Sequence, residues 1–186
     1  MTAPLPERAA LDDVLSRLVR DIPDFPKPGV MFKDISPLLA DHDGLTTVVH
    51  ALASAGRDAE GRTAVDKVVG IEARGFILAA PVALALGAGF VPVRKAGKLP
   101  GPVHRVSYAL EYGEAVLEVH EDAVAPGERV LVIDDVLATG GTVNAAVELV
   151  GSCGGEVAAI AVLLELGFLG GREHLGAAPL LALHTV

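Results

Sequence analysis

The sequence is poor in the residues that support several classes of site. Its 186 residues include one cysteine, no tryptophan and 4% aromatic residues. A single cysteine, Cys153, excludes an internal disulfide framework and a cluster of thiolate metal ligands. The six histidines are scattered along the chain and none has the spacing of a zinc-binding pair. The 15 basic residues are outnumbered by 24 acidic ones, which leaves a formal net charge of −9 and argues against a general nucleic-acid binder.

Membrane and export signals are also lacking. The first eight residues contain an acid and two prolines, where a signal peptide needs basic and then apolar residues. Residues 75–93 form a long run without charge, but Pro81 and the glycines Gly87 and Gly89 interrupt it, so a buried helix followed by a buried strand is the better interpretation. We therefore expect a cytoplasmic protein that has no membrane partner, with a single domain over residues 1–186.

Two kinds of apolar segment, one strand-like and one with helical spacing, alternate along the chain. Short apolar runs typical of buried strands are separated by segments with helical spacing, which indicates an α/β fold with a mostly parallel sheet. A hairpin is expected where two strand-like segments flank a Tyr-Gly turn. The expected strands are 65–71, 90–93, 107–111, 115–120, 129–133, 157–164 and 180–183, and the expected helices are 9–20, 43–56, 76–86 and 142–153.

The most informative stretch is 130–142, VLVIDDVLATGGT. An apolar strand is followed by two adjacent carboxylates, Asp134 and Asp135, at the edge where doubly wound sheets bind ligands. A loop of small and hydroxylated residues then opens the next helix, and its backbone N–H groups and helix N-terminus suit a phosphate. The pairing predicts a sugar phosphate; the alternative is a strand–turn–helix corner whose acids cap the helix. The loop residues are Ala138, Thr139, Gly140, Gly141 and Thr142.

This stretch resembles the phosphoribosyl-pyrophosphate signature of the type I phosphoribosyltransferases. Residues 25–37 (FPKPGVMFKDISP), 69–76 (VGIEARGF), 94–101 (RKAGKLPG) and 108–113 (YALEYG) are similar, in the same order, to segments of the adenine-specific members of that family. The resemblance implies that family's fold: a central, mostly parallel sheet flanked by helices, a small N-terminal hood at about residues 20–40, and a flexible loop at about residues 95–107.

The resemblance also implies roles for the residues around the sugar phosphate. Asp134 and Asp135 would face the ribose hydroxyls, directly or through magnesium and water, and the loop 138–142 would hold the 5′-phosphate. Arg74 would bind pyrophosphate during catalysis, beside a cis peptide between Glu72 and Ala73. The alternative for Arg74 is a solvated side chain that pairs with Glu72.

A basic segment and a glutamate follow in the family's flexible loop. By resemblance, Arg94, Lys95 and Lys98 would contact pyrophosphate, and they lie in a stretch without acids that suits a mobile cover. Their alternative is an ordinary solvated loop. Glu111 is the candidate for handling the proton that adenine N9 loses, and its alternative is an exposed strand glutamate.

The hood motif implies the site for the base. Phe32 would stack on adenine while the backbone groups of Met31 and Lys33 read its amino edge; for Phe32 the alternative is core packing. The implied reaction converts adenine and phosphoribosyl pyrophosphate into AMP and pyrophosphate in purine salvage, with Mg²⁺ as cofactor and a homodimer as the assembly. A transferase for another purine such as xanthine, or a non-catalytic regulator that senses phosphoribosyl pyrophosphate, remains the alternative.

Overall fold

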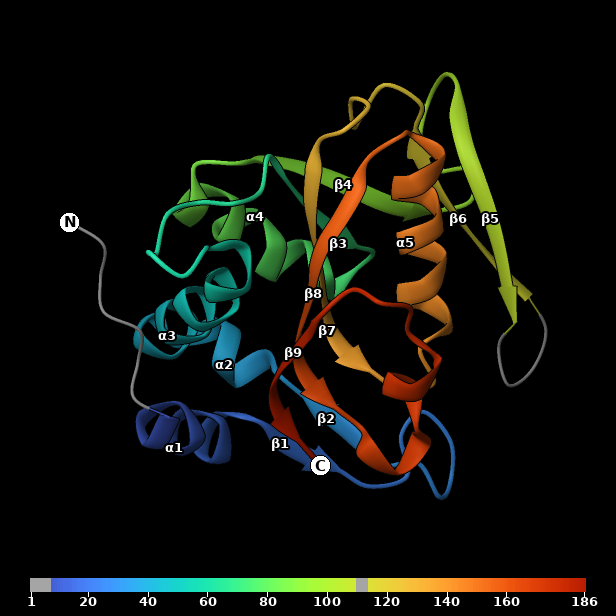
Figure 1. The fold of residues 1–186 in the computed structure, drawn as a ribbon. Coiled ribbons are helices and arrows are strands. Elements are labelled where there is room, and N and C mark those ends of the chain that lie inside the picture. The colour runs from blue at the N-terminus through green and yellow to red at the C-terminus, as the bar shows by residue number, and fades with distance from the viewer. Residues whose placement is uncertain (1–7, 110–113) are drawn as a thin grey trace. The chain divides into compact units, whose positions relative to one another are not determined.

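The computed structural model describes residues 8–109 and 114–186 of the chain. Its contacts group the residues into two compact units, 1–51 and 52–186, which are described separately below. Figure 1 shows the elements of both units with their labels.

In the N-terminal unit, the described residues form three helices and a pair of short strands. The expected amphipathic helix is confirmed as α1, in which Leu11 and Leu15 are buried. The two strands pair in antiparallel fashion, with Arg20 opposite Asp34, and flank the proline-rich segment that cannot form regular structure. The elements are α1 (Arg8–Leu18), β1 (Arg20–Ile22), β2 (Phe32–Asp34), α2 (Ser36–Ala40) and α3 (His42–Ala53), most of which belongs to this unit.

The second unit is built on a seven-stranded sheet with the strand order β5-β6-β4-β3-β7-β8-β9. The neighbours from β4 to β9 run parallel, whereas β6 pairs in antiparallel fashion with both β5 and the end of β4. The Tyr-Gly turn expected between β5 and β6 lies outside the described residues. The predicted α/β fold with a mostly parallel sheet is therefore confirmed. The strands are β3 (Lys67–Ile71), β4 (Gly89–Lys95), β5 (Val103–Ala109), β6 (Glu114–His120), β7 (Arg129–Leu137), β8 (Glu156–Glu165) and β9 (Leu180–Thr185).

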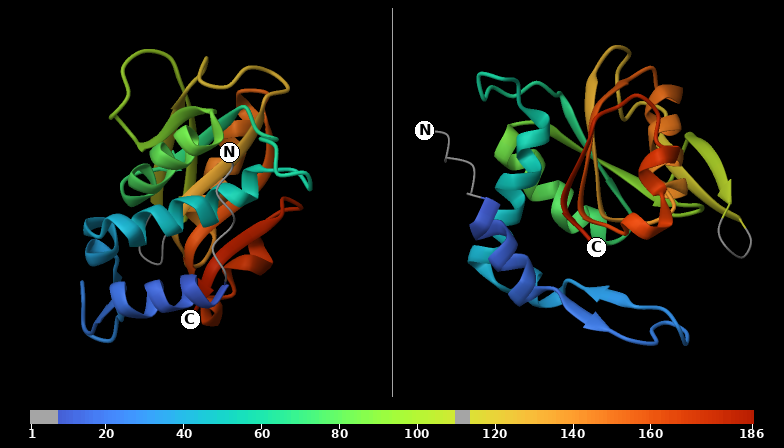
Figure 2. Two further views of the ribbon diagram at one scale, coloured as in Figure 1. Left: turned by 90° about the vertical axis from the view of Figure 1, so that its left-hand side faces the viewer. Right: turned by 60° about the horizontal axis from the view of Figure 1, so that its bottom comes forward.

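Two helices cover opposite faces of this sheet (Figures 1 and 2). Helix α4 (Arg74–Leu86) connects β3 to β4, and α5 (Gly141–Ser152) connects β7 to β8. Because these two crossovers run in opposite directions from the neighbouring strands β3 and β7, right-handed connections place their helices on opposite faces. The chain order therefore reverses between β3 and β7, and ligands of open α/β sheets bind beyond the carboxyl ends of strands at such a point.

The charge-free run 75–93 forms most of α4 and the first part of β4, as expected for a buried helix followed by a strand. Gly87 ends the helix with a φ of 67°, a left-handed cap that glycine adopts without strain. Among the described residues, no helix is both long enough and apolar enough to cross a bilayer. Three short 3₁₀ turns, η1 (Ser54–Gly56), η2 (Gly167–Leu169) and η3 (Gly171–His174), complete the unit.

Candidate active site

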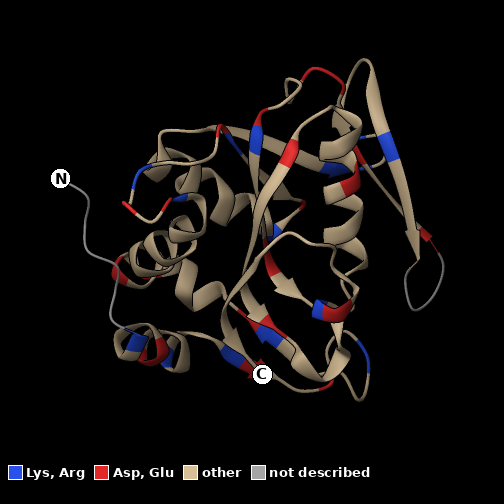
Figure 3. Cartoon of the chain, in the orientation of Figure 1, with Lys and Arg blue, Asp and Glu red and all other residues tan. Residues whose placement is uncertain are grey.

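The acid pair lies inside β7, whereas the sequence predicted that it follows the strand. The strand continues to Leu137 because its last residues still pair with β8, with Val136 opposite Leu164. Both acids are buried, and the backbone N–H of Asp135 donates to Oδ1 of Asp134 at 2.9 Å. The carboxyl-terminal part of β7 is correspondingly red in Figure 3. The acids still lie at the carboxyl-terminal end of the sheet, beside the point where the chain order reverses.

Burial sets the protonation behaviour of the pair. It raises the pKa of Asp134 well above the ordinary value, and the neighbouring charge of Asp135 raises it further. Burial also raises the pKa of Asp135, although the guanidinium of Arg74 opposes that shift. Because burial makes the ionised form of the two carboxylates costly, they suit partners that bring positive charge, as Arg74 brings to Asp135, or hydroxyl hydrogens.

Arg74 joins the end of β3 to the acids of β7. It is the first residue of α4, and its Nη2 lies 2.7 Å from Oδ2 of Asp135. This contact favours a place in the site over the alternative of a solvated arginine that pairs with Glu72. The peptide bond between Glu72 and Ala73 is cis, as the resemblance implied. The strands β3 and β7 are neighbours in the sheet, so the two loops that follow them meet at one edge.

Glu72 connects this loop to the basic segment. Its Oε2 accepts a hydrogen bond from the backbone N–H of Lys95 at 2.9 Å and lies 3.4 Å from Nε of Arg94. Burial alone would raise the pKa of Glu72, but the Lys95 hydrogen bond and the charge of Arg94 lower it below its ordinary value. Glu72 therefore stays ionised and ties the end of β4 to the segment that carries Arg74.

The small-residue loop forms a cradle at the start of α5. A cavity of about 50 Å³ is lined there by Val136–Val143, which includes the whole loop predicted to hold phosphate. Gly140 has a φ of 89° in the left-handed region, and the helix begins at Gly141, one residue earlier than expected. Backbone N–H groups at a helix N-terminus favour an anion, so the cradle has the chemistry of a phosphate site.

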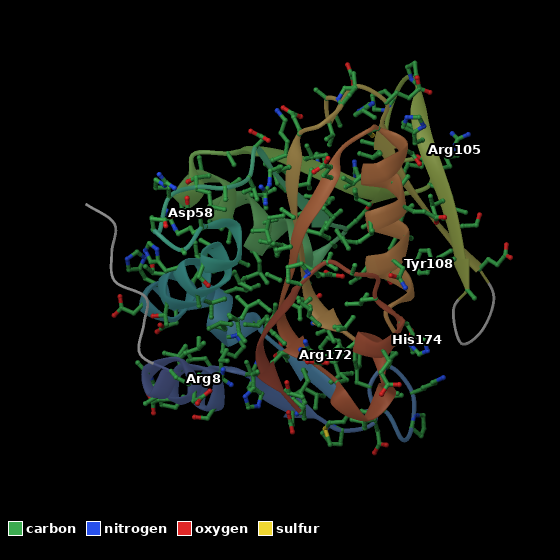
Figure 4. All side chains as sticks on the ribbon, viewed as in Figure 1. Arg8, Asp58, Arg105, Tyr108, Arg172 and His174 are labelled. Atoms are coloured by element: carbon green, nitrogen blue, oxygen red, sulfur yellow. The ribbon has the colours of Figure 1, made fainter. Side chains whose placement is uncertain are left out.

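The end of β5 lies against this cradle. A Cβ atom on Gly141 would stand 3.3 Å from Cδ2 of Tyr108 and 3.4 Å from the carbonyl oxygen of Ala109, so a larger residue at this position would crowd the strand. Figure 4 shows Tyr108 beside α5. Residues 110–113, which include the candidate Glu111, lie outside the described residues.

The basic segment is held by a buried acid that sequence reasoning missed. Oε1 of Glu118 accepts a hydrogen bond from Nε of Arg105 at 2.7 Å, and its Oε2 accepts one from the backbone N–H of Gly97 at 2.9 Å. The side chain of Glu118 is only 1% exposed. The hydrogen bond from Arg105 lowers the pKa of Glu118 below its ordinary value, despite the opposing effect of burial. A single acid inside the apolar strand 115–120 was the available signal.

Besides Arg74, three residues of the basic segment were predicted to contact pyrophosphate, and two of them belong to β4. Arg94 and Lys95 end that strand, and Lys98 follows in the turn before β5. Nη1 of Arg94 donates to the carbonyl oxygen of Lys98 at 3.1 Å, which holds the turn against the strand end. Of the range expected for the flexible loop, residues 96–102 connect the strands and 103–107 belong to β5.

The residues predicted for the base belong to the N-terminal unit. Phe32 in β2 is partly buried, and its ring meets that of Phe25 edge to face with centroids 5.0 Å apart. Met31 is 50% exposed, and Nζ of Lys33 donates to Oδ1 of Asp21 at 2.7 Å. Phe32 is therefore neither a fully buried core residue nor a free surface ring, because it packs against one aromatic neighbour, Phe25.

Comparisons with known proteins agree with these features. A family model described as "Phosphoribosyl transferase domain" matches residues 38–172. A protein of Nocardioides sp. (strain JS614) named adenine phosphoribosyltransferase is 64% identical over 186 residues, all of both chains. The crystal structure of the adenine phosphoribosyltransferase from Thermoanaerobacter pseudethanolicus is 47% identical with a TM-score of 0.88, over 95% of this chain and 99% of that one.

A second solved structure adds bound ligands. The adenine phosphoribosyltransferase of Saccharomyces cerevisiae, in complex with adenine and D-2,5-dideoxy-2,5-imino-altritol 1,6-bisphosphate, is 37% identical with a TM-score of 0.89, over 94% of this chain and 99% of that one. Identity at this level over nearly whole chains leaves one assignment: the chain belongs to the phosphoribosyl transferase family and, within it, to the adenine phosphoribosyltransferases.

Proposed function

We propose that the protein transfers the 5-phosphoribosyl group of phosphoribosyl pyrophosphate to N9 of adenine, which yields AMP and pyrophosphate in purine salvage. The observation that carries the proposal is the meeting of Arg74 with the Asp134–Asp135 pair beside the cradle 136–143. The cation matches the pyrophosphate of the substrate, and the two carboxylates match its ribose hydroxyls. The backbone donors of the cradle match its 5′-phosphate.

Each group of the site has a part that its chemistry suits. The cradle would bind the 5′-phosphate through neutral backbone donors, which explains how a chain with a net charge of −9 can hold an anion. Asp134 and Asp135 would accept hydrogen bonds from the ribose hydroxyls. Arg74 would stabilise charge on the departing pyrophosphate, aided by Arg94, Lys95 and Lys98 of the basic segment.

The acid pair fits magnesium as well as hydroxyls. Carboxylate oxygens are hard donors, and burial raises the pKa of both acids, so a cation nearby would favour the ionised form that binding requires. Among the described residues, no group of three or more His, Cys, Asp or Glu side chains could hold an ion by itself. Mg²⁺ would therefore enter with the substrate and neutralise its pyrophosphate, with the two acids reaching it through water.

The base and the proton complete the proposal. Phe32 would stack on adenine, and the backbone of Met31 and Lys33 would distinguish its amino edge from a 6-oxopurine, because a mismatched base leaves buried donors and acceptors unpaired. The adenine bound to the yeast enzyme supports this base. Glu111 is proposed to accept the proton from N9, on the strength of the motif alone.

We further propose a cytoplasmic homodimer. Two side chains of α4 in the second unit, Ile77 and Leu84, lie one helical repeat of seven residues apart and are 47% and 84% exposed, respectively. Large apolar side chains that share one face of a helix suit burial against a second copy. Sedimentation of the purified protein tests the assembly: a dimer that dissociates in a variant carrying Leu84→Glu supports it, and a wild-type monomer contradicts it.

The reaction is tested by measuring pyrophosphate release with adenine, hypoxanthine, guanine and xanthine, each with and without Mg²⁺. We expect release that depends on both adenine and Mg²⁺. Preference for xanthine would move the assignment to another member of the family, and tight binding of phosphoribosyl pyrophosphate without turnover of any base would indicate a regulator. The variant Glu148→Gln is a control for substitution outside the site: it changes an exposed acid on α5 and should leave activity unchanged.

A further inference from the structure

The backbone of η3 supports the cradle at a residue that does not line its cavity. The 3₁₀ turn η3 begins at Gly171, which is buried, and a Cβ atom there would overlap the carbonyl oxygen of Ala138 and stand 3.1 Å from the backbone nitrogen of Gly140. In the opposite direction, a Cβ on Gly140 would stand 2.9 Å from the carbonyl oxygen of Gly171. The two backbones are therefore in direct contact, at a distance that only glycine allows.

The support contacts the loop without lining the cavity. Among the described residues, the cavity is lined by Val136–Val143. Gly171 therefore acts on the loop and not on a ligand inside it. Because backbone donors bind an anion well only if they are already oriented, a rigid surface behind the loop would favour the binding conformation.

An ion pair fixes η3 to the sheet. Nε and Nη2 of Arg172 donate to the two carboxylate oxygens of Glu165, at 2.9 and 2.6 Å. Glu165 is the last residue of β8 and is 6% exposed, so its carboxylate is held by a rigid strand. The hydrogen bond from Arg172 lowers the pKa of Glu165 below its ordinary value, which keeps the pair charged.

A second attachment joins η3 to α5. Nδ2 of Asn144, in the first turns of that helix, donates to the carbonyl oxygen of His174 at 2.8 Å. Figure 4 shows Arg172 and His174 leaving η3 in opposite directions. The turn is thus fixed to β8 on one side and to α5 on the other, with Gly171 pressed against the loop that connects β7 to α5.

We propose that Gly171, Arg172 and Glu165 are positioning residues for the 5′-phosphate: they hold the loop 138–142 in the conformation that binds it, from behind the site. This inference rests on the proposed function of the loop. It predicts that damage to η3 weakens binding of the phosphoribosyl substrate selectively, because the groups proposed for the base and for the proton are not touched.

The sharpest test replaces Gly171 by alanine. Its φ lies outside the left-handed region, so alanine is tolerated by the conformation of residue 171 itself, and Gly171→Ala acts by pushing against the backbone of Ala138 and Gly140. Gly176→Ala is the matched control, since a Cβ there meets no atom within 4 Å. We expect Gly171→Ala to raise KM for phosphoribosyl pyrophosphate and Kd for ribose 5-phosphate about tenfold, with KM for adenine within about twofold, and Gly176→Ala to change none of them.

Variants of Arg172 test the same inference if Gly171→Ala does not fold. Arg172→Ala should raise the same two constants, and Arg172→Lys should fall between it and wild type, because lysine keeps the charge but not the two parallel hydrogen bonds. Unchanged binding of ribose 5-phosphate in folded variants, or a fall in kcat alone, would overturn the inference. Ribose 5-phosphate binding without transfer to adenine in the wild type would instead overturn the proposed function and leave this inference standing.

Discussion

Replacing Asp134 by asparagine should stabilise the protein while it damages the site. Asp134 is 9% exposed, and the backbone N–H of Asp135 donates to its Oδ1. Asparagine has nearly the same shape and its amide oxygen can accept that hydrogen bond, so the substitution removes a buried charge and little else. Since a charge without full compensation loses several kcal/mol on burial, we expect a gain of about 1–3 kcal/mol at neutral pH.

The direction of the pKa shift of Asp134 determines how the stability gained by Asp134→Asn changes with pH. Burial, followed by the charge of Asp135, raises the pKa of Asp134 in the folded state above its unfolded value. The stability that the protonated acid contributes is therefore fully present below the unfolded pKa of about 4 and is lost as the pH rises through the folded pKa. The advantage of Asp134→Asn should accordingly grow from acid to neutral pH.

Thermal unfolding followed by circular dichroism between pH 4 and 8 measures this difference. For a chain of this size, 1 kcal/mol corresponds to about 2–4 °C, so the melting temperature should rise by about 2–12 °C at pH 7. Glu148→Gln, an exposed acid on α5, controls for the change in net charge. A variant that melts below the wild type at pH 7, or a difference that does not depend on pH, would refute the reasoning. Adenine transfer should fall about 10- to 100-fold, as expected when a hydrogen bond to a charged group is lost.

Three further predictions concern the ion pairs around the site. Arg74→Lys should raise KM for phosphoribosyl pyrophosphate about tenfold in steady-state assays, because lysine cannot keep the 2.7 Å contact with Asp135 and also present a planar fork to pyrophosphate. An unchanged KM would remove Arg74 from the pyrophosphate site. Glu118→Gln should speed trypsin cleavage after Lys98 severalfold, because the amide binds Arg105 and the Gly97 N–H more weakly; equal cleavage rates would show that Glu118 does not hold the turn. The Arg172 hydrogen bond lowers the pKa of Glu165, so the stability that this pair contributes is present above the unfolded pKa of about 4.3 and is lost as the pH falls through the folded pKa. Arg172→Ala should therefore melt below wild type at pH 7 and approach it at pH 3–4; a gap that is constant with pH would contradict the pairing.

The regular part of the fold was predictable because it depends on local pattern. The strands 65–71 and 129–133 and the helix 142–153 have periodicities that burial in a parallel sheet requires, and the structure has an element at each. Strand β7 extended past the predicted end because pairing with β8 outweighs the low strand propensity of two aspartates. The pair β1 and β2 was missed because three-residue strands carry too little pattern to be recognised.

The sequence indicated candidate residues for the site, but it did not indicate the contacts among them. Motifs identified Arg74 and Asp135, yet no local pattern indicated that they form an ion pair 2.7 Å long, since 61 positions separate them and sheet order brings them together. Glu118 and Glu165 likewise look like isolated acids in apolar strands. Their arginine partners, Arg105 and Arg172, come from different elements, so only the folded chain shows why these acids are tolerated in buried positions.

The central claim is that this site joins adenine to a phosphoribosyl group. Phosphorus-31 NMR of one reaction mixture tests it most directly: wild-type protein, adenine, phosphoribosyl pyrophosphate and Mg²⁺. We predict that the signals of AMP and pyrophosphate grow in equal molar amounts as those of phosphoribosyl pyrophosphate fall, and that neither appears without adenine. Phosphoribosyl pyrophosphate that stays intact, or that yields ribose 5-phosphate and pyrophosphate without AMP, would contradict the account.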